Sequence, residues 1–450
     1  MAVVTGAFPE AADGAGRSRN EEGRKASLLF VNQHYWPDVA STGQHLADLA
    51  EFLVAQGHEV SVLASRGRYV KGKVPAPLEE TRHGVTIRRV RTTGFGRARH
   101  VGRLVDYASF YIQALGMLFA GGKRYDGVVF LTTPPLLSFL GAIAKTLRRR
   151  RYGVWSMDLH PDAEIASGML KPTSLAARML ERMNAVGYRQ ADFVVDLGRH
   201  MKARIVAKGV RPERTHTVHV WNRKEEVEPT PRDANPVIDE LGLREKFVVM
   251  YSGNAGLVHE FAPILEAMRL TKDDARIFWL FVGDGPRRPE IERYIAEHGI
   301  RNAMYRGYFP REQLRYSLSV GDAHLISLKP QFVGISVPGK LYGIMASGRP
   351  AIFVGPERSE SGETVLEAEC GVVVDPATGG AAGRIVETVR QWAQSPAVAA
   401  EQGRRGRDAF LRDFEREACC AEFAQVIGGA FTAGGSAPSG RHTEAAPARQ

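Results

Sequence analysis

Residues 28–63 read LLFVNQHYWPDVASTGQHLADLAEFLVAQGHEVSVL, and this stretch decides the fold class. Its first four residues form a short apolar run typical of a buried strand, and residues 44–55 carry the apolar spacing of an amphipathic helix. A second apolar strand follows at residues 58–63. Strands that are apolar throughout are typical of a parallel sheet with helices on both faces, so the stretch predicts an α/β fold.

The same alternation of strands and helices continues along the chain in two series. The first series has further strands at residues 127–131, 153–157, 191–196 and 215–220. The second series has strands at residues 246–251, 277–282, 323–326, 351–354 and 371–374. Two doubly wound, Rossmann-like domains are therefore predicted, and a ligand should bind in the cleft between them, at the carboxyl ends of the strands.

The length and local composition of the chain indicate where the domains begin and end. A chain of 450 residues has room for two domains of ordinary size. We expect the first domain at residues 26–222, a charged, proline-containing linker at 223–240, and the second domain at 241–430, with a last helix that could pack back on the first domain. Residues 1–25 and 431–450 are rich in small residues and lack apolar periodicity, so both tails are expected to be disordered.

Charge and cysteine content narrow the class of function. The chain has 60 Lys and Arg against 50 Asp and Glu, a net charge of +10. Two basic clusters suit phosphate groups or an anionic membrane, or else are solvated basic faces. They consist of Arg88, Arg89, Arg91, Arg97, Arg99 and Arg103, and of Arg148 to Arg151. The three cysteines have neither zinc nor disulfide spacing, which favours a reducing, cytoplasmic setting. We expect no secretory signal, no membrane span and no nucleic-acid module.

Three turns place glycines where a strand is expected to end and a helix to begin. They contain Thr42 and Gly43, then Gly253 and Asn254, and then Gly283, Asp284, Gly285 and Pro286. Glycine lets the backbone approach a ligand closely, and helix N-termini attract anions, so these turns are candidates for binding a phosphorylated ligand. Tight strand-to-helix turns that bind nothing use the same residues, and this alternative stays open.

A longer glycine-containing segment runs from Gly334 to Pro350. Its loop consists of Gly334, Ile335, Ser336, Val337, Pro338 and Gly339, and Lys340 follows in the first turn of an expected helix. A lysine is unfavourable near the positive end of a helix unless an anion binds there. Backbone N–H groups together with Lys340 therefore predict a diphosphate cradle, and a solvent-exposed lysine is the alternative.

Two polar side chains follow the strand expected at residues 153–157. Asp158 and His160 should lie at the edge of the cleft. Side chains of these types orient hydroxyl groups or transfer protons. A helix-capping aspartate and a structural histidine are the alternative.

In order and spacing, these segments resemble family 4 of the retaining glycosyltransferases, which have the GT-B fold, and especially the branch that builds bacterial exopolysaccharides, such as colanic-acid and fucosamine-type transferases. The segments that carry the resemblance are residues 34–43, 57–60, 158–162, 251–254, 281–286 and 338–350. The resemblance implies a nucleotide-sugar donor bound mainly by the second domain and an acceptor bound by the first. It implies a retaining transfer that needs no metal or cofactor. It also implies that His160 lies near the donor sugar, and that Lys340 and residues 334–339 contact the sugar and the diphosphate.

The chain departs from the family pattern at this site. The family commonly has two acidic residues eight positions apart, and the matching positions here are Ile335 and Gly343. Glu363, with Glu360 beside it in the next loop, is the expected substitute carboxylate. The family's phosphate-binding Arg and Lys, after the first strand of the second domain, also lack counterparts.

These observations predict a glycosyltransferase that moves a hexosyl or N-acetylhexosaminyl group from a nucleoside diphosphate to a saccharide or polyprenyl-linked acceptor, in exopolysaccharide or surface-glycan synthesis. Two alternatives stay open: a sugar-nucleotide 2-epimerase of the same fold, and a non-catalytic partner in a polysaccharide assembly complex.

Residues 107–119 are strongly apolar and lie beside the first basic cluster. They predict peripheral attachment to the inner face of the plasma membrane, or else a core helix.

Overall fold

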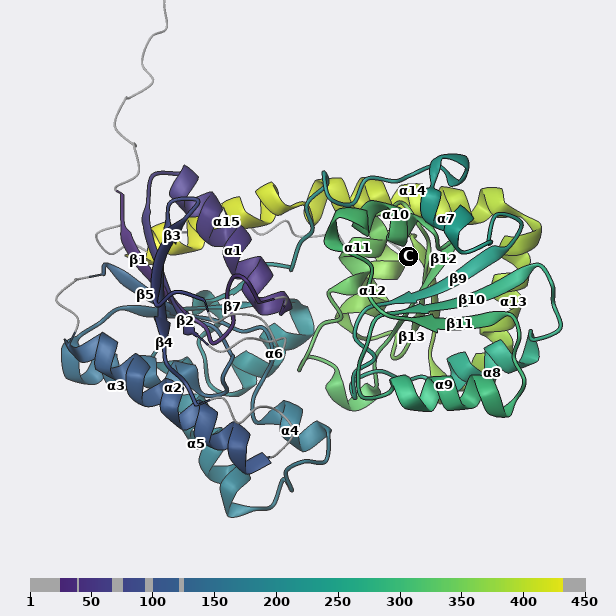
Figure 1. Ribbon diagram of the computed structural model, residues 1–450. Coiled ribbons are helices and arrows are strands. Elements are labelled where there is room, and N and C mark those ends of the chain that lie inside the picture. The colour runs from purple at the N-terminus through teal and green to yellow at the C-terminus, as the bar shows by residue number, and fades with distance from the viewer. Residues whose placement is uncertain (1–24, 39, 67–75, 94–99, 121–124, 432–450) are drawn as a thin grey trace, which may run out of the picture.

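The computed structural model describes residues 25–38, 40–66, 76–93, 100–120 and 125–431. Figure 1 shows two α/β domains side by side, with the yellow C-terminal helices running across both of them. Each domain is built around one sheet, and the two sheets have eight and six strands. The prediction of two doubly wound α/β domains is confirmed. The tails predicted to be disordered lie outside the described residues, apart from Lys25 and Phe431 at their edges.

The sheet of the first domain has the strand order β3-β4-β2-β1-β5-β6-β7-β8. Neighbouring strands are parallel except β3 and β4, which pair antiparallel at one edge. The strands are β1 (Ser27–Val31), β2 (Glu59–Ser65), β3 (Glu79–Arg82), β4 (Val85–Val90), β5 (Gly127–Phe130), β6 (Tyr152–Trp155), β7 (Phe193–Asp196) and β8 (Thr215–Thr217). The central strands are buried on both faces because helices cover both, which explains their uninterrupted apolar sequences.

In its described residues, this domain contains six α-helices by sequence. They are α1 (Ser41–Ala55), α2 (His100–Ala120), α3 (Leu137–Arg148), α4 (Asp162–Ala166), α5 (Leu175–Arg189) and α6 (Arg199–Ala207). In the described part of α2, Phe110, Ala114 and Leu118 are buried in the core, whereas Ile112 is exposed. The apolar helix predicted at residues 107–119 thus packs on the sheet with one face and leaves another face open. Every described helix is too short or too polar to cross a bilayer.

The second domain has the strand order β11-β10-β9-β12-β13-β14, and all its pairs are parallel. The strands are β9 (Phe247–Ser252), β10 (Ile277–Val282), β11 (Ala303–Arg306), β12 (Ala323–Ser327), β13 (Ala351–Val354) and β14 (Gly371–Val374). The helices are α7 (Pro236–Glu240), α8 (Ala262–Leu270), α9 (Arg288–Glu297), α10 (Leu314–Ser319), α11 (Lys340–Ala346), α12 (Glu360–Glu367), α13 (Ala381–Gln394) and α14 (Pro396–Asp413). The last helix, α15 (Arg416–Phe431), leaves this domain.

Two predicted boundaries need correction. The linker predicted at residues 223–240 is too long, because α7 begins at Pro236 and buries Val237 and Ile238 in a core cluster with residues of β9 and β10. At the other end, α15 packs on the first domain: the Phe423 ring lies 4.8 Å from that of Trp155, and Phe431 contacts Phe193. The predicted tail therefore begins one residue too early, since Phe431 is the last residue of α15 and is buried.

Three strands, β3 and β11 at a sheet edge and β4 next to one, were missing from the sequence prediction. They are polar or only alternately apolar because one side of each faces solvent, so they lack the continuous apolar run of the central strands. Two arginines of the first basic cluster lie in β4, where Arg88 pairs with Glu79 and Arg89 with Glu80 across the hairpin. These two arginines stabilise the sheet edge. Arg97 and Arg99 lie outside the described residues, as does the side chain of Arg103.

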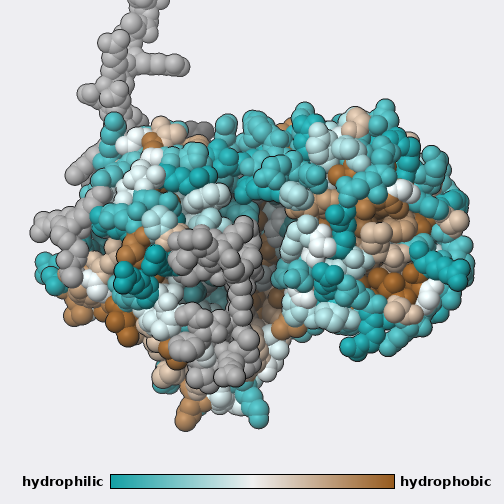
Figure 2. All heavy atoms as spheres, viewed as in Figure 1, coloured by the Kyte–Doolittle hydropathy of each residue, from teal (hydrophilic) through white to brown (hydrophobic). Residues whose placement is uncertain are grey.

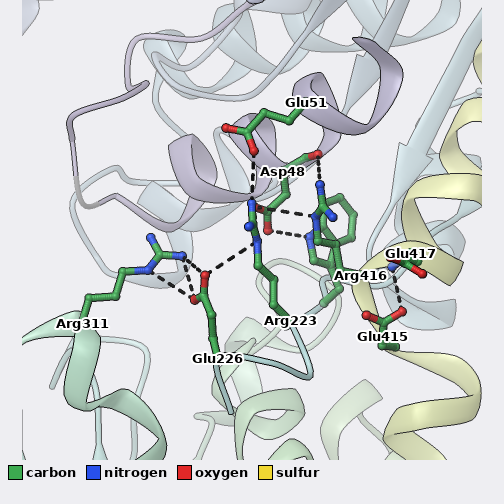
Figure 3. A network of polar contacts seen from close by, with 9 residues as sticks. Asp48, Glu51, Arg223, Glu226, Arg311, Glu415, Arg416 and Glu417 are labelled. Carbon is green, nitrogen blue, oxygen red and sulfur yellow. Dashed lines mark hydrogen bonds and ion pairs between the residues drawn. The ribbon is translucent and has the colours of Figure 1, made fainter. Parts of the chain in front are cut away.

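The chain crosses between the domains twice, and a polar network joins the two crossings to α1 (Figure 3). Asp48 of α1 is at its centre: it accepts hydrogen bonds from the indole N–H of Trp221 at 3.0 Å and from Nε of Arg223 at 2.9 Å. Arg416, at the start of α15, donates to the Asp48 carbonyl oxygen at 3.2 Å. Glu226 in turn accepts a hydrogen bond from Arg311 of the second domain at 2.9 Å. This hinge network fixes both crossings to the first domain.

Candidate functional site

The ammonium group of Lys340 lies at the carboxyl end of β9. Its Nζ donates a hydrogen bond to the Tyr251 hydroxyl at 2.5 Å and sits 3.8 Å from the centre of the Tyr251 ring. The Tyr251 hydroxyl donates in turn to the Asn254 carbonyl oxygen at 2.9 Å. Among the described residues, no carboxylate forms an ion pair with Lys340, and burial lowers its pKa to about 7. A cation held without a counter-ion favours the binding of an anion.

His259 forms the other side of the Lys340 environment. Its Nδ1 lies 2.6 Å from the Ser327 carbonyl oxygen, which fixes the proton on Nδ1, and its Nε2 faces Lys340 Nζ at 3.5 Å. Burial, followed by the charge of Lys340, lowers the His259 pKa well below its usual range, and Arg287 and Lys329 act in the same direction. His259 is therefore neutral, and three cationic side chains surround it. No contiguous motif indicates Arg287 and Lys329, because they come from two other loops of the domain.

The glycine turns after β9 and β10 pack directly against each other. Gly253 and Gly283 both have positive φ angles, and a Cβ at Gly283 would lie 2.1 Å from the Gly253 carbonyl oxygen. A Cβ at Gly285 would lie 2.6 Å from the Asn254 side chain, and the Asp284 carbonyl oxygen accepts a hydrogen bond from Ala255. Neither turn can carry side chains at these glycines. The turns therefore present mainly backbone beside Lys340, as a diphosphate cradle requires.

The predicted loop from Gly334 to Gly339 reaches the first domain. A single antiparallel bridge pairs Ser336 with Asp158, and the Leu159 N–H donates to the Ile335 carbonyl oxygen at 3.0 Å. Gly339 packs on Val220, and Pro338 accepts the first hydrogen bond of the turn that leads into α11. The helix α11 has only seven residues, so its dipole adds little to the site. The cradle therefore depends on Lys340 and on loop backbone.

Asp158 and His160 lie in the segment of the first domain that meets the loop before Lys340. Burial raises the Asp158 pKa, although the charge of His160 and a hydrogen bond from the Ser336 side chain act against it. His160 Nδ1 lies 2.8 Å from Glu164. Burial lowers the His160 pKa, but the hydrogen bond and charge of Glu164 outweigh it, so that the pKa lies above its usual value. With Nδ1 held by Glu164, the Nε2 side of the His160 ring is the one that can orient a hydroxyl group.

The other two predicted site residues, Gly43 and Glu363, have partners away from Lys340. Gly43, in the first turn of α1, leaves space for the backbone of His34 and Tyr35, so its missing side chain is explained by packing. Glu363 pairs with His200 at 3.1 Å and with Arg199 at 3.3 Å, both from α6. Among the described side chains, no hydrogen bond or ion pair joins Lys340 to Asp158, His160 or Glu363. The structure thus brings Lys340 together with the two glycine turns, and Asp158 together with Ser336, as two adjoining groups.

The two positions that lack the family's carboxylates have different surroundings. Ile335 is buried and reaches the first domain through its backbone. At Gly343, an added Cβ would lie 3.6 Å from the Asn222 side chain, so there is space for a small side chain. Asn222 belongs to the first crossing between the domains, and its amide is the polar group nearest to this position.

Comparisons with known proteins bear on the fold and on the family. Two facing Rossmann-like domains are the architecture of the GT-B fold, which solved glycosyltransferases share. Residues 42–221, nearly all of the first domain, match the family described as "Glycosyl transferase 4-like domain". The resemblance of the chain to family 4 glycosyltransferases is thereby confirmed.

Two curated proteins and one solved structure illustrate the match. The chain is 27% identical over 272 residues to the probable glycosyltransferase WbjE of Pseudomonas aeruginosa, which covers 60% of this chain and 68% of that protein. It is 23% identical over 346 residues to the putative colanic acid biosynthesis glycosyl transferase WcaI of Escherichia coli strain K12, covering 75% and 85%. The fold resembles that of HepE from Anabaena, solved with UDP and glucose, with a TM-score of 0.67 at 16% identity over 89% of this chain and 99% of HepE.

Proposed function

We propose that the protein transfers a hexosyl or N-acetylhexosaminyl group from a nucleoside diphosphate donor to a polyprenyl-linked saccharide, with retention of configuration, in exopolysaccharide or surface-glycan synthesis. The observation that carries the proposal is Lys340, whose amino group has no carboxylate partner among the described residues and lies beside two turns of glycine backbone. Relatives named for glycan synthesis and a structural neighbour that binds UDP and glucose support it.

In this proposal the protein acts mainly by positioning and by electrostatics. Lys340, with Arg287 and Lys329 nearby, offsets the charge that develops on the departing diphosphate. Asp158 and His160 orient hydroxyl groups of the donor sugar or the acceptor, because both lie where the first domain meets the Ser336 loop. The proposed transfer uses no metal or cofactor.

One observation favours a second candidate, a non-catalytic partner in a polysaccharide assembly complex. Both family carboxylates are absent, at Ile335 and Gly343, and the expected substitute, Glu363, is paired with α6. Such a protein would bind a nucleoside diphosphate without turning over any sugar nucleotide.

A thermal-shift screen of sugar nucleotides tests the donor site. At a concentration of 100 Kd, a ligand that binds the folded state stabilises it by about 2.7 kcal/mol, which corresponds to about 5–10 °C for a domain of this size. We expect one donor to reach this shift with the natural protein and to lose it with Lys340→Met. Absence of a shift for every nucleotide sugar and for free nucleoside diphosphates would contradict the proposal. A shift without transfer to any acceptor, including the host's membrane lipids, would favour the non-catalytic candidate.

We also propose attachment to the inner face of the plasma membrane, through a face formed by α2, α3 and α5. Figure 2 shows hydrophobic atoms at the lower left, where α2 and α3 lie in Figure 1. Ile112 of α2, Leu147 of α3 and Leu175 of α5 are 70%, 67% and 82% exposed. The basic run from Arg148 to Arg151 follows α3 directly. Exposed apolar side chains beside arginines suit the interface of an anionic membrane.

Vesicle sedimentation tests this face. We expect binding to vesicles with anionic lipid at low salt, and a decrease of about tenfold for Leu147→Asp, because inserting one leucine contributes about 1.5–3 kcal/mol. Leu270→Asp, at an exposed leucine of the second domain, is the matched control and should bind as the natural protein does. Equal binding by all three proteins would remove this face from the proposal.

A further inference from the structure

The helix α6 contacts both groups of the candidate site. Arg204, in its middle, donates from Nε to the Val333 carbonyl oxygen at 2.7 Å, directly before the Gly334 loop. Its Nη1 lies 3.7 Å from Asp162, which follows His160 in the first domain. The backbone of α6 approaches Gly334 closely, since a Cβ at Gly334 would lie 2.6 Å from the His200 carbonyl oxygen. One face of α6 thus joins the Lys340 loop to the Asp158–Asp162 segment.

The first turn of α6 faces α12 of the second domain. Arg199 donates two hydrogen bonds to Glu367, at 2.5 and 2.8 Å, and its Nε lies 3.3 Å from Glu363 and 3.7 Å from Glu360. His200 Nε2 lies 3.1 Å from Glu363. We call these five residues the α6–α12 clasp. Every pair in it joins one domain to the other.

Glu360 is the buried member of the clasp. Its side chain is 4% exposed; Arg199 Nε lies 3.7 Å and His219 Nδ1 lies 3.9 Å from its Oε1, and a contact with the Arg199 backbone N–H partly offsets the effect of burial, which raises the Glu360 pKa. Gly198 permits this position, because a Cβ there would lie 2.2 Å from Glu360 Oε2. Burying a carboxylate with so few close partners is costly, and the carboxylate regains water if the domains separate. Glu360 therefore opposes closure, while the Arg199 pairs favour it.

The exposed members of the clasp contribute little to stability. The side chains of Arg199 and Glu367 are 49% and 57% exposed, and such pairs are typically worth about 0–1 kcal/mol. The hinge network differs, because the Asp48 carboxylate at its centre is largely buried. The hinge is thus the more deeply buried connection between the domains, and the clasp is the more exposed and weaker one.

We propose that α6 is a positioning element for the transfer reaction. The clasp holds the two domains together, and Arg204 keeps the loop from Gly334 to Gly339 in its position relative to Asp158 and His160. The inference goes beyond the proposed function in naming the residues that set this register. Its kinetic test depends on the proposed function, whereas its structural test does not.

The structural test is small-angle X-ray scattering of the full chain. We expect Arg199→Glu to increase the radius of gyration, because it places a fourth carboxylate among Glu360, Glu363 and Glu367, and we expect Arg199→Lys to leave it unchanged. Arg244→Glu is the matched control, since Arg244 forms a similar two-bond pair with Asp239 inside one domain. If the radius of gyration of Arg199→Glu is unchanged, with or without a lower melting temperature, the clasp does not hold the domains together.

The kinetic test uses Arg204→Ala and Arg204→Lys, with the donor found in the thermal-shift screen and host-membrane lipid as acceptor. A displacement of about 1 Å can cost about 10²-fold in rate, so we expect Arg204→Ala to lower kcat by that factor, with donor KM and melting temperature nearly unchanged. Arg204→Lys should recover part of the rate, because it keeps the charge near Asp162. An unchanged kcat, or a loss that follows a lower melting temperature, would refute positioning by Arg204. If the natural protein transfers no sugar, the proposed function fails, and scattering alone decides the clasp.

Discussion

Lys340→Met should lower sugar transfer by about 10²–10³-fold, the loss seen when one group that stabilises a developing negative charge is removed. Methionine has a similar length and is apolar, so it fills the space against the Tyr251 ring without a buried charge. The Tyr251 hydroxyl keeps its hydrogen bond to Asn254. Folding should therefore be preserved, and kcat/KM together with the melting temperature measures the effect.

Lys329→Met is the matched control for this substitution. It removes the same charge from the neighbourhood of His259 without changing the contact with Tyr251. We expect a smaller loss of transfer than for Lys340→Met. Equal turnover by the natural protein and by folded Lys340→Met would exclude Lys340 from the mechanism.

The Lys340 pKa of about 7 makes the expected effect depend on pH. Below pH 7 the empty site already holds the cation, and above pH 7 donor binding must first bring a proton to it. Donor affinity should therefore fall, by at most about tenfold per pH unit, as pH rises above 7. The free energy of unfolding of the empty protein should increase as the pH rises from 7 to about 10.5. In this range Lys340 keeps its proton in the unfolded chain but has lost it in the folded protein. Lys340→Met should abolish both trends.

Asp48→Ala should lower the free energy of unfolding by about 3 kcal/mol, the lower end of the range for breaking a buried ion pair, since Arg223 is partly exposed. The substitution leaves the buried Trp221 N–H and the Arg223 guanidinium without their acceptor. Urea denaturation of the full chain measures the change. Because the hinge network joins both crossings and α15 to α1, we expect the two domains to lose their fixed connection as well (Figure 3).

Glu51→Ala is the control for Asp48→Ala. Glu51 touches the same guanidinium only at 3.4 Å and lies at the margin of the network. Its loss should cost less than about 1 kcal/mol, as for an exposed pair. Similar destabilisation by both substitutions would show that Asp48 has no special role.

The central strands and most helices were predictable because their signals are local. The run from Leu28 to Val31 is apolar on both faces, and only a strand covered on both sides requires that. The strands β3, β4 and β11, which lie at a sheet edge or next to one, were missed because one side of each faces solvent. The start of α7 was missed for another reason: Pro236 suggests a linker, but it also suits the first turn of a helix.

Some residues of the candidate site were recognisable from the sequence, and others were not. Lys340, Gly253, Gly283 and Gly285 were recognisable because turn chemistry and a lysine before a helix are properties of short segments. The contributions of Arg287 and Lys329 were not, because they approach His259 from other loops. The expectation that Glu363 replaces a missing carboxylate was reasonable from its position in the chain, but its actual partners, Arg199 and His200, come from the other domain.

The sequence by itself determined the two α/β domains, the resemblance to family 4 glycosyltransferases and the loop that leads to Lys340, since each depends on local periodicity or on contiguous motifs. Only the tertiary structure decided how the domains face each other: Asp158 meets Ser336, α6 meets α12, and Asp48 joins both crossings. The physical reason is that these are pairings of single polar groups far apart in the chain. Nothing in the neighbouring residues specifies the partner, which is set by the packing of the two domains as a whole.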